Sequence, residues 1–203
     1  MMKQIIVLLL VGLFLFTAFG CTGPVTQTSG NQTGDNMTKT KKEIVVLETN
    51  KGNIEIELDR AKAPITVENF VTYVKSCQYN RTLFHRVISG FMIQGGGFSA
   101  DGGEKPTRAP IKLESNNGLK NVEGSIAMAR TGDPNSATAQ FFINTADNSA
   151  LDYTPDNPGY TVFGKVVSGM DVVKKIEAVQ TGSWGPYDDW PVQPVIIINA
   201  RMK

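Results

Sequence analysis

The sequence predicts a mainly β fold, a closed antiparallel barrel with two α-helices. Three observations lead to this fold class. Most apolar runs have the length of a strand, only two segments show helical spacing, and long loops rich in glycine and proline lie between them. A parallel sheet would need strands and helices in regular alternation, which this chain does not show. Short strands with few helices are typical of an antiparallel barrel.

The first predicted element is a β-hairpin. Residues 44–49 and 54–58 are apolar-rich runs that flank Asn50-Lys51-Gly52-Asn53. The second run alternates apolar and charged residues, as expected of a strand with one buried face. The sequence therefore predicts two paired strands at the start of the domain.

Two segments are predicted to be helical. Pro64 suits the first position of a helix that should reach Ser76, and a second helix is expected from about Met170 to Ala178. Apolar residues near helical spacing form their inward faces: Ile65, Val67, Phe70, Val71 and Val74 in the first, and Val172, Val173 and Ile176 in the second. The remaining predicted strands cover residues 83–88, 92–95, 125–130, 140–144, 161–167 and 194–200.

Composition limits the classes of function. The 203 residues carry a net charge of +1, and without residues 1–20, which hold one lysine and no acid, 19 basic and 19 acidic residues remain. A nucleic-acid partner would need a basic surface, so none is expected. The single histidine and the absence of a Cys/His cluster with ligand spacing predict no metal site and no cofactor.

Residues 1–20 are predicted to be a secretory signal peptide. Lys3 precedes an unbroken apolar run from Ile5 to Phe16, which is short for a membrane-spanning helix. Residues 21–43 are polar and contain no aromatic side chain, so they are expected to form a flexible tether. The predicted folded domain covers residues 44–203.

Cys21 directly follows Gly20 and resembles the lipidated cysteine of bacterial and archaeal lipoproteins. Two residues depart from that pattern, Ala18, where leucine is preferred, and the bulky Phe19. Ordinary cleavage after Gly20, which leaves a free thiol, is the alternative, and an uncleaved anchor is a third. We expect lipidation, and hence a protein held at the cell membrane that faces the periplasm or the cell exterior. The alternative location is soluble, either secreted or periplasmic.

Cys77 is the only other cysteine. A disulfide with Cys21 would tie the fold to the lipid anchor, so it is rejected. Cys77 is instead predicted to be a buried or half-buried free thiol.

Two segments carry the features from which a function can be inferred. The first is Phe84-His85-Arg86-Val87-Ile88-Ser89-Gly90-Phe91-Met92-Ile93-Gln94-Gly95-Gly96-Gly97, and the second comprises Met128-Ala129-Arg130 and Gln140-Phe141-Phe142-Ile143-Asn144. In order, spacing and composition they resemble the cyclophilins, a family of peptidyl-prolyl cis/trans isomerases, and most closely the bacterial periplasmic branch. The resemblance covers about Ile44 to Arg201 and implies an eight-stranded barrel capped by a helix at each end.

Strand periodicity sorts the side chains of these segments by face. In the strand at 83–88 it places Phe84, Arg86 and Ile88 on one face, and His85 and Val87 on the other. It also pairs Met92 with Gln94, and Gln140 with Phe142 opposite Phe141. The faces that carry Arg86, Gln94, Gln140, Met92 and Phe142 can then line one groove. The resemblance implies that they do, because these positions match the family's substrate groove.

The resemblance also implies a role for each residue. Arg86 matches the catalytic arginine, and Gln94 matches the glutamine that orients it and the rotating carbonyl. The pocket for the proline ring matches Phe91, Met92, Phe142 and Leu151, and the other substrate-binding positions are Ala129, Arg130, Gln140 and Tyr160. Taken alone, an arginine on a strand is more often a solvated surface charge. The joint motif favours the catalytic interpretation.

Three positions depart from eukaryotic relatives. Ala150 stands where cyclosporin-sensitive relatives carry tryptophan, Tyr160 where many have histidine, and Arg130 where they have asparagine. The resemblance thus implies isomerase activity with weak cyclosporin binding. His85 is expected to be structural, because it lies on the face opposite Arg86 and the reaction needs no proton transfer.

These observations predict a peptidyl-prolyl cis/trans isomerase that acts on X-Pro bonds of exported proteins, without a cofactor. Its partners are expected to be proline-containing polypeptides and the membrane, and the protein is expected to be a monomer. The alternative is a non-catalytic chaperone or scaffold module that binds proline segments. A peptide-bond hydrolase is disfavoured, because no serine or cysteine lies in a pattern that would activate it.

Overall fold

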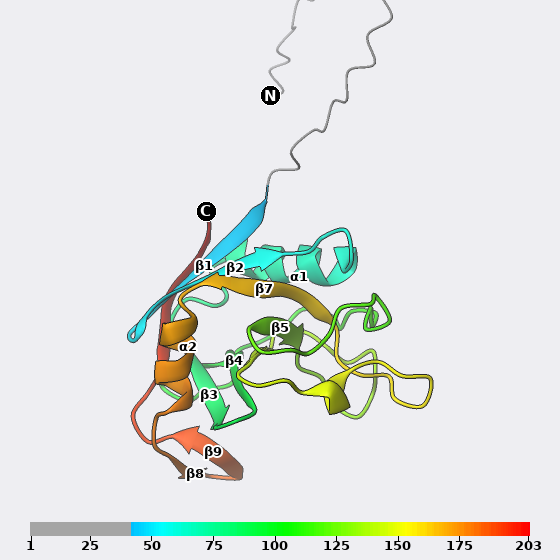
Figure 1. The fold of residues 1–203 in the computed structure, drawn as a ribbon. Coiled ribbons are helices and arrows are strands. Elements are labelled where there is room, and N and C mark those ends of the chain that lie inside the picture. The colour runs from blue at the N-terminus through cyan, green and yellow to red at the C-terminus, as the bar shows by residue number, and fades with distance from the viewer. Residues whose placement is uncertain (1–41) are drawn as a thin grey trace, which may run out of the picture. The chain divides into compact units, whose positions relative to one another are not determined.

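The computed structural model describes residues 42–203 (Figure 1). The predictions for the signal peptide, for Cys21 and for most of the tether concern residues outside this range. The strands are β1 (Glu43–Thr49), β2 (Gly52–Leu58), β3 (Thr82–Ile88), β4 (Met92–Ser99), β5 (Ser125–Met128), β6 (Phe141–Asn144), β7 (Val162–Ser168), β8 (Thr181–Trp184), β9 (Tyr187–Pro191) and β10 (Ile196–Met202). The α-helices are α1 (Pro64–Lys75) and α2 (Met170–Glu177), and a short 3₁₀ helix, η1, spans Ser149–Leu151.

Within residues 42–203, eight strands close a barrel in the order β1-β10-β3-β4-β6-β5-β7-β2. All of its neighbouring strands run antiparallel. The predicted β-hairpin is present as β1 and β2, paired from Glu43↔Leu58 to Thr49↔Gly52. Closure leaves no barrel strand with an unpaired edge. The predicted fold class, a closed antiparallel barrel with two helices, is confirmed.

Aromatic side chains fill the barrel interior and bring the helix α1 into the same core. Phe141 on β6 meets Phe70 of α1 edge-to-face at 5.5 Å and Tyr79 at 5.4 Å between ring centroids. These rings are fully buried, and α2 adds Val173 and Ile176 to the same core cluster. The inward faces predicted for the two helices therefore pack on the barrel core, except that Ile65 is 43% exposed.

The predicted alternation along β3 is wrong for Phe84, and also for His85, which packs in the outer cluster with Phe98 and Trp190 and does not share the inner face with Val87. Irregular register between β3 and β4 on both sides of Phe84 shifts the strand's pleat. Phe84 and Val87 both enter the core cluster, whereas Arg86 is exposed and Ile88 packs outside the barrel. Simple period-two counting fails here because a bulge inserts a residue and re-aims the side chains that follow it.

The prediction that Cys77 is a buried or half-buried thiol is also wrong as to burial, although the thiol is free. The helix α1 ends at Lys75, and Cys77 lies in the following turn with a left-handed φ of +58° and an exposed side chain. Several strand bounds also differ from the prediction; β4 continues to Ser99 beyond the predicted residue 95, and β5 ends at Met128 before the predicted residue 130.

A second sheet, the hairpin β8–β9, was not predicted. It lies beside β3 below the barrel in Figure 1. Trp190 of β9 is buried and packs against Phe98 at 5.3 Å and His85 at 5.9 Å between ring centroids. This apolar cluster on the outer face of β3 and β4, which also contains Leu83, holds the hairpin in place.

Phe141→Ala is expected to lower the free energy of unfolding by about 3–5 kcal/mol, because it removes a ring that contacts others from α1 and β3 and leaves a cavity. Urea unfolding would measure the change. Ile198→Ala is the matched control, since that side chain is 53% exposed on β10 and surface changes usually stay within about 0.5 kcal/mol. Equal losses in the two variants would contradict the assignment of Phe141 to the core.

Candidate active site

Four residues form a row across the outer face of the barrel. Arg86 on β3 pairs with Gln94 on β4, Gln94 pairs with Phe142 on β6, and Phe142 pairs with Ala127 on β5. Residues opposite each other in an antiparallel ladder project to the same side of the sheet. The register thus brings a cation, an amide and an apolar ring side by side on one surface.

A hydrogen bond links the two glutamines of this surface. Gln94 Nε2 donates to Gln140 Oε1 at 2.8 Å. Gln140 lies close over Gly97, where an added Cβ would come within 2.5–2.8 Å of three atoms of the Gln140 side chain. The glycine run 95–97 therefore has a local structural reason, since Gly97 leaves room for Gln140.

An apolar cluster, the candidate pocket, lies beside these polar groups. Its buried members are Met92, Ala127, Phe142 and Val162, of which Met92 is 2% and Phe142 4% exposed. The partly buried side chains that pack around this cluster are Ile88, Phe91, Leu119, Ala129, Leu151 and Tyr160. Tyr160 meets Phe142 edge-to-face at 5.6 Å between centroids. The structure thus brings together the predicted pocket residues Phe91, Met92, Phe142 and Leu151 with Ala129 and Tyr160.

Arg130 lies at the side of this pocket, where it covers Tyr160. Its guanidinium carbon is 4.5 Å from the centre of the Tyr160 ring, within the range of a cation–π contact. Its Nε donates to the carbonyl of Gly159 at 3.0 Å, and its Nη1 donates to the carbonyl of Thr131 at 2.8 Å. Arg130 therefore braces Tyr160. Ala129 joins the pocket to β6, because its N–H donates to the carbonyl of Gln140 at 2.9 Å.

Half-buried and buried amides hold the segments that carry the apolar cluster, and they were not predicted from the sequence. Asn148 Nδ2 and the Thr145 N–H both donate to the carbonyl of Phe91, at 2.8 and 3.0 Å. Asn144 donates to Asn121 at 3.2 Å, in the interior between β6 and the loop before β5. No sequence pattern marks these residues, because asparagine is common in loops. Their roles depend on contacts between distant segments.

A second part of the same network fixes the segment that carries Leu151. The Asn121 N–H donates to Asp152 Oδ1 at 2.8 Å, and Asn121 Nδ2 donates to the Leu151 carbonyl at 3.0 Å. The Tyr160 N–H also donates to the Leu151 carbonyl, at 2.9 Å. Backbone and side-chain bonds thus position both Leu151 and Tyr160 at the pocket. Ala150, which is exposed in η1, leaves this side open.

Arg86 is the most exposed of the predicted catalytic groups. Its side chain is 45% exposed, and among the described residues its ion-pair partner is Asp189 of β9, with Nε 3.8 Å from Oδ2. Because that distance exceeds hydrogen-bond length, the contact is an ion pair only. The guanidinium thus stands at the groove with donors available to a bound molecule.

His85 lies in the cluster under the β8–β9 hairpin, on the outer face of β3, and is also next to the Gln140 side chain. Its ring lies 4.7 Å from that of Phe98, and its Nδ1 is buried without a hydrogen-bond partner. Burial lowers the pKa of His85 to about 4, with a smaller contribution of the same sign from the Arg86 charge. A buried, neutral histidine at pH 7 fits the structural role that was predicted for it.

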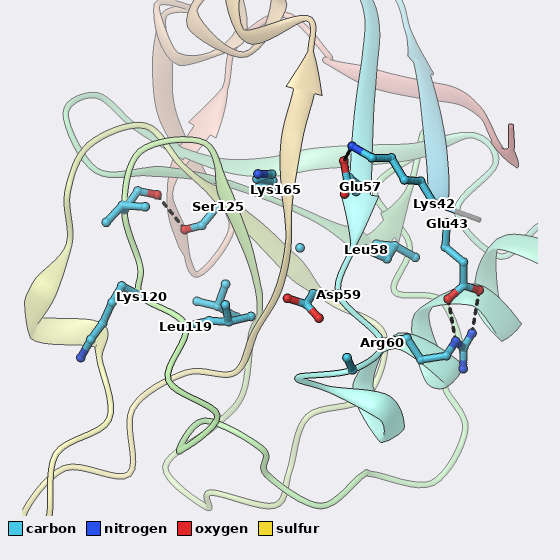
Figure 2. A pocket seen from close by; sticks show the side chains of 14 residues that line it. Lys42, Glu43, Glu57, Leu58, Asp59, Arg60, Leu119, Lys120, Ser125 and Lys165 are labelled. Atoms are coloured by element: carbon cyan, nitrogen blue, oxygen red, sulfur yellow. Dashed lines mark hydrogen bonds and ion pairs between the residues drawn. The ribbon is translucent and has the colours of Figure 1, made fainter. Parts of the chain in front are cut away.

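A hollow lies on the barrel wall next to the apolar cluster (Figure 2). It has a volume of about 890 Å³, and β2, β7 and the loop before β5 supply most of its lining. Figure 2 shows Asp59 and Leu119 near its middle and the Glu43–Arg60 ion pair, Nε to Oε2 2.6 Å, at one side. Its lining includes Leu119 and Val162 of the apolar pocket's cluster but not Arg86. Size alone therefore does not identify the site.

Between residues 42 and 203, no group of three or more His, Cys, Asp or Glu side chains is arranged to hold a metal ion. The helices in this range are too short or too polar to span a membrane.

The fold and this surface define a class of protein: an eight-stranded antiparallel β-barrel in which an exposed cation and an amide lie next to an apolar cluster on the outer face. The family model "Cyclophilin type peptidyl-prolyl cis-trans isomerase/CLD" matches residues 44–202. The chain therefore belongs to the cyclophilin-type peptidyl-prolyl cis-trans isomerase family, and it is an isomerase of this type. The predicted enzyme class is confirmed.

Individual relatives agree with this assignment. The chain is 56% identical over 158 residues to peptidyl-prolyl cis-trans isomerase A of Dickeya dadantii, covering 78% of this chain and 83% of that protein. It is 54% identical over 163 residues to peptidyl-prolyl cis-trans isomerase B of Escherichia coli, covering 79% and 99%. A solved cyclophilin-type isomerase from Cryptosporidium parvum aligns with a TM-score of 0.66 at 28% identity, covering 80% and 98%. A structure of the same protein was determined in the presence of the dipeptide Ala-Pro, with the same TM-score and identity, covering 79% and 98%.

Gly97→Ala should lower kcat/KM while the protein stays folded. The new Cβ would collide with Gln140 and separate it from Gln94. Loss of one neutral hydrogen bond is worth about 1 kcal/mol, which corresponds to about a five-fold fall. A protease-coupled isomerisation assay would measure it. Gly132→Ala is the control, because an added Cβ there meets no atom within 4 Å. Full activity in Gly97→Ala would show that the glutamine pair is not needed.

The stability of the fold should depend on the protonation of His85. Its pKa is about 4 in the folded protein and about 6.5 in an unfolded chain, so the unfolded state binds more protons between these values. The stabilisation is complete above pH 6.5 and is lost as the pH falls towards 4. From pH 7 to pH 5 the free energy of unfolding should drop by about 2 kcal/mol.

Urea unfolding at a series of pH values would test this prediction. The variant His85→Phe keeps an aromatic ring in the cluster without a titrating group, so its free energy of unfolding should change little between pH 7 and pH 5. An unchanged slope in the variant would assign the pH dependence to another group.

Proposed function

We propose that this isomerase acts on X-Pro bonds of polypeptides outside the cytoplasm, with Arg86 as the catalytic residue and Gln94 as the group that orients it. One observation carries the assignment of the site. The register from Arg86 through Gln94 to Phe142 puts a permanent cation within two strands of an apolar pocket. An X-Pro segment is complementary to this surface. Its apolar proline ring can lie on the apolar residues while the amide before it lies beside the cation.

The chemistry needs a surface that favours a twisted amide. Rotation about a peptide bond passes a barrier of about 18–20 kcal/mol that is set by amide resonance. Only contacts that are stronger in the twisted state than in either planar form lower that barrier. When the amide twists, the proline nitrogen becomes pyramidal and gains a lone pair that can accept a hydrogen bond. A guanidinium donor aimed at this nitrogen stabilises the twisted state selectively.

Arg86 suits that task because its guanidinium stays charged and presents a rigid fork of donors. Gln94 is its register partner and is itself held by Gln140, so its amide has a defined direction. The pocket floor of Met92 and Phe142 receives the proline ring and fixes the axis about which the bond rotates. The Ala-Pro dipeptide used with the Cryptosporidium parvum relative is the type of ligand that this arrangement fits.

The mechanism requires no acid or base. His85 lies in the hairpin cluster with its ring against Phe98 and has a pKa of about 4, so it is neutral at pH 7 and offers no proton to the reaction. The pocket contributes a low-polarity surface next to the amide. Such a surface favours the twisted form, because that form has lost part of the charge separation of the planar amide.

Arg86→Ala should lower kcat/KM by about 10²–10³-fold, the usual effect of removing one donor aimed at a transition state. Arg86→Lys should restore little activity, because an ammonium group lacks the fork geometry. A protease-coupled assay on a proline peptide would measure both variants. Circular dichroism would check that they are folded, as expected for an exposed side chain.

Full activity in folded Arg86→Ala would remove this residue from the mechanism. A protein that binds proline peptides but does not accelerate their isomerisation, even in the unmutated form, would instead support a non-catalytic binding module.

The proposed location follows from the N-terminal sequence. An apolar run with Lys3 before it and Cys21 after Gly20 supports export followed by lipidation. Two or three acyl chains would hold the protein at a membrane, because each buried methylene contributes about 0.8 kcal/mol. The polar segment up to Glu43 would then link the anchor to the barrel. Its substrates would be exported chains in the course of folding.

Cys21→Ser should abolish incorporation of labelled fatty acid in cells, because the hydroxyl cannot replace the thiol as the acceptor. The mass of the mature N-terminus of the unmutated protein would identify the modification. Cys77→Ser is the matched control and should still be labelled. A mature, unmodified protein in the soluble fraction would contradict lipidation without affecting the isomerase assignment.

A further inference from the structure

The β8–β9 hairpin contacts β3 at two successive residues. Trp190 packs on His85 at 5.9 Å between ring centroids, and the preceding residue of β9, Asp189, faces the following residue of β3, Arg86. Trp190 is buried against Phe98 as well, so its position is fixed by packing. The same packing therefore sets where the Asp189 carboxylate lies relative to the guanidinium.

The backbone of Asp189 is suited to this placement. It has a left-handed φ of +61°, one of three non-glycine residues with positive φ in residues 42–203. Asp and Asn tolerate this conformation better than other side chains. The irregular register between β8 and β9 accompanies this local change of direction in the hairpin. The hairpin thus adopts an uncommon local conformation at the residue that faces Arg86.

We propose that Asp189 is a positioning residue for Arg86. This inference rests on the catalytic role proposed for Arg86. The carboxylate lies 3.8 Å from Nε, the inner nitrogen of the guanidinium. An anion on the Nε edge leaves the two terminal Nη groups, and their four N–H donors, for the groove. Asp189 therefore limits the rotation of an otherwise exposed side chain and selects which edge meets the substrate.

The size of the effect follows from exposure. The two side chains are 45% and 41% exposed, so water and salt screen their attraction. Exposed ion pairs contribute little to the stability of the fold. In this pair, however, one partner is Arg86, the proposed catalytic residue. Loss of the ion pair should therefore lower kcat. The rate effect should also be larger at low salt than at high salt.

The adjacent acid provides a matched control. Asp188 carries the same charge, but its Oδ1 accepts a hydrogen bond from Ser183 within the hairpin at 2.9 Å. Asp189→Asn and Asp188→Asn therefore remove the same charge one residue apart. Asparagine also tolerates the left-handed backbone at Asp189, so that variant should keep the hairpin folded.

The full-length protein and these variants should be assayed for kcat and KM on an uncharged proline peptide at low and high salt. In Asp189→Asn we expect kcat to fall about three- to five-fold at low salt with KM unchanged, the scale of an exposed ion pair. Asp188→Asn should match the unmutated protein. Asp189→Gly, which also removes the side-chain acceptor, should fall at least as far. An unchanged kcat in Asp189→Asn would overturn the proposal, because the carboxylate would then make no contribution to catalysis. An increased kcat would also overturn it, because the carboxylate would then reduce the ability of Arg86 to stabilise the transition state.

A second readout reports positioning directly. Nitrogen-15 relaxation of the Arg86 Nε–H group should show a lower order parameter in Asp189→Asn and no change in Asp188→Asn. Asp189→Asn should also have no further effect on the rate in an Arg86→Ala background, as expected for two residues that act as a unit. An additive double mutant, or an unchanged order parameter, would count against the proposal.

The results separate this inference from the catalytic assignment. If Arg86→Ala is fully active, the catalytic role of Arg86 fails. If Arg86→Ala is impaired but Asp189→Asn behaves like the unmutated protein, only the positioning role fails.

Discussion

The alternation of side chains across β6 is the constraint on which the other features depend. Phe141 points into the barrel and joins the rings of Phe70 and Tyr79, whereas Phe142 points outward and forms the floor of the pocket. A single strand thus serves both the core and the groove, and any slip in its register would exchange the two. Closure of the barrel prevents that slip, because β6 is paired on both sides by β4 and β5.

Much of the fold could be predicted because its patterns are local. Strand-length apolar runs, a proline that starts α1 and two amphipathic helices can each be recognised from the residues of one short segment. The position of Phe84 could not be predicted, because the bulge that turns it inward depends on the pairing of β3 with β4. The hairpin β8–β9 was missed for a related reason. Its polar, glycine-containing sequence shows no strand period, and its stability comes from Trp190 packing on another part of the chain.

Most residues proposed for the site were recognisable as a set because they lie in short motifs that one family shares, at 84–97, 128–130 and 140–144, whereas Leu151 and Tyr160 lie beyond them. Their placement in the structure agrees with a single surface: the register aligns Arg86, Gln94 and Phe142. The residues that hold them could not be found in the same way. Asn121, Asn148 and Asp189 come from separate loops or strands, and each acts only through a partner that the fold brings near.

The pairing of β1 with β10 has a consequence for how the enzyme is made. These strands are the first and last of the barrel, and β10 also pairs with β3, which carries Arg86. During synthesis the wall cannot close until β10 has emerged, so β3 keeps an open edge until then. Such sequence-distant pairing slows folding. The isomerase therefore depends on its last barrel strand, and a truncation within β10 would open the wall between β1 and β3 although it removes no residue of the proposed site.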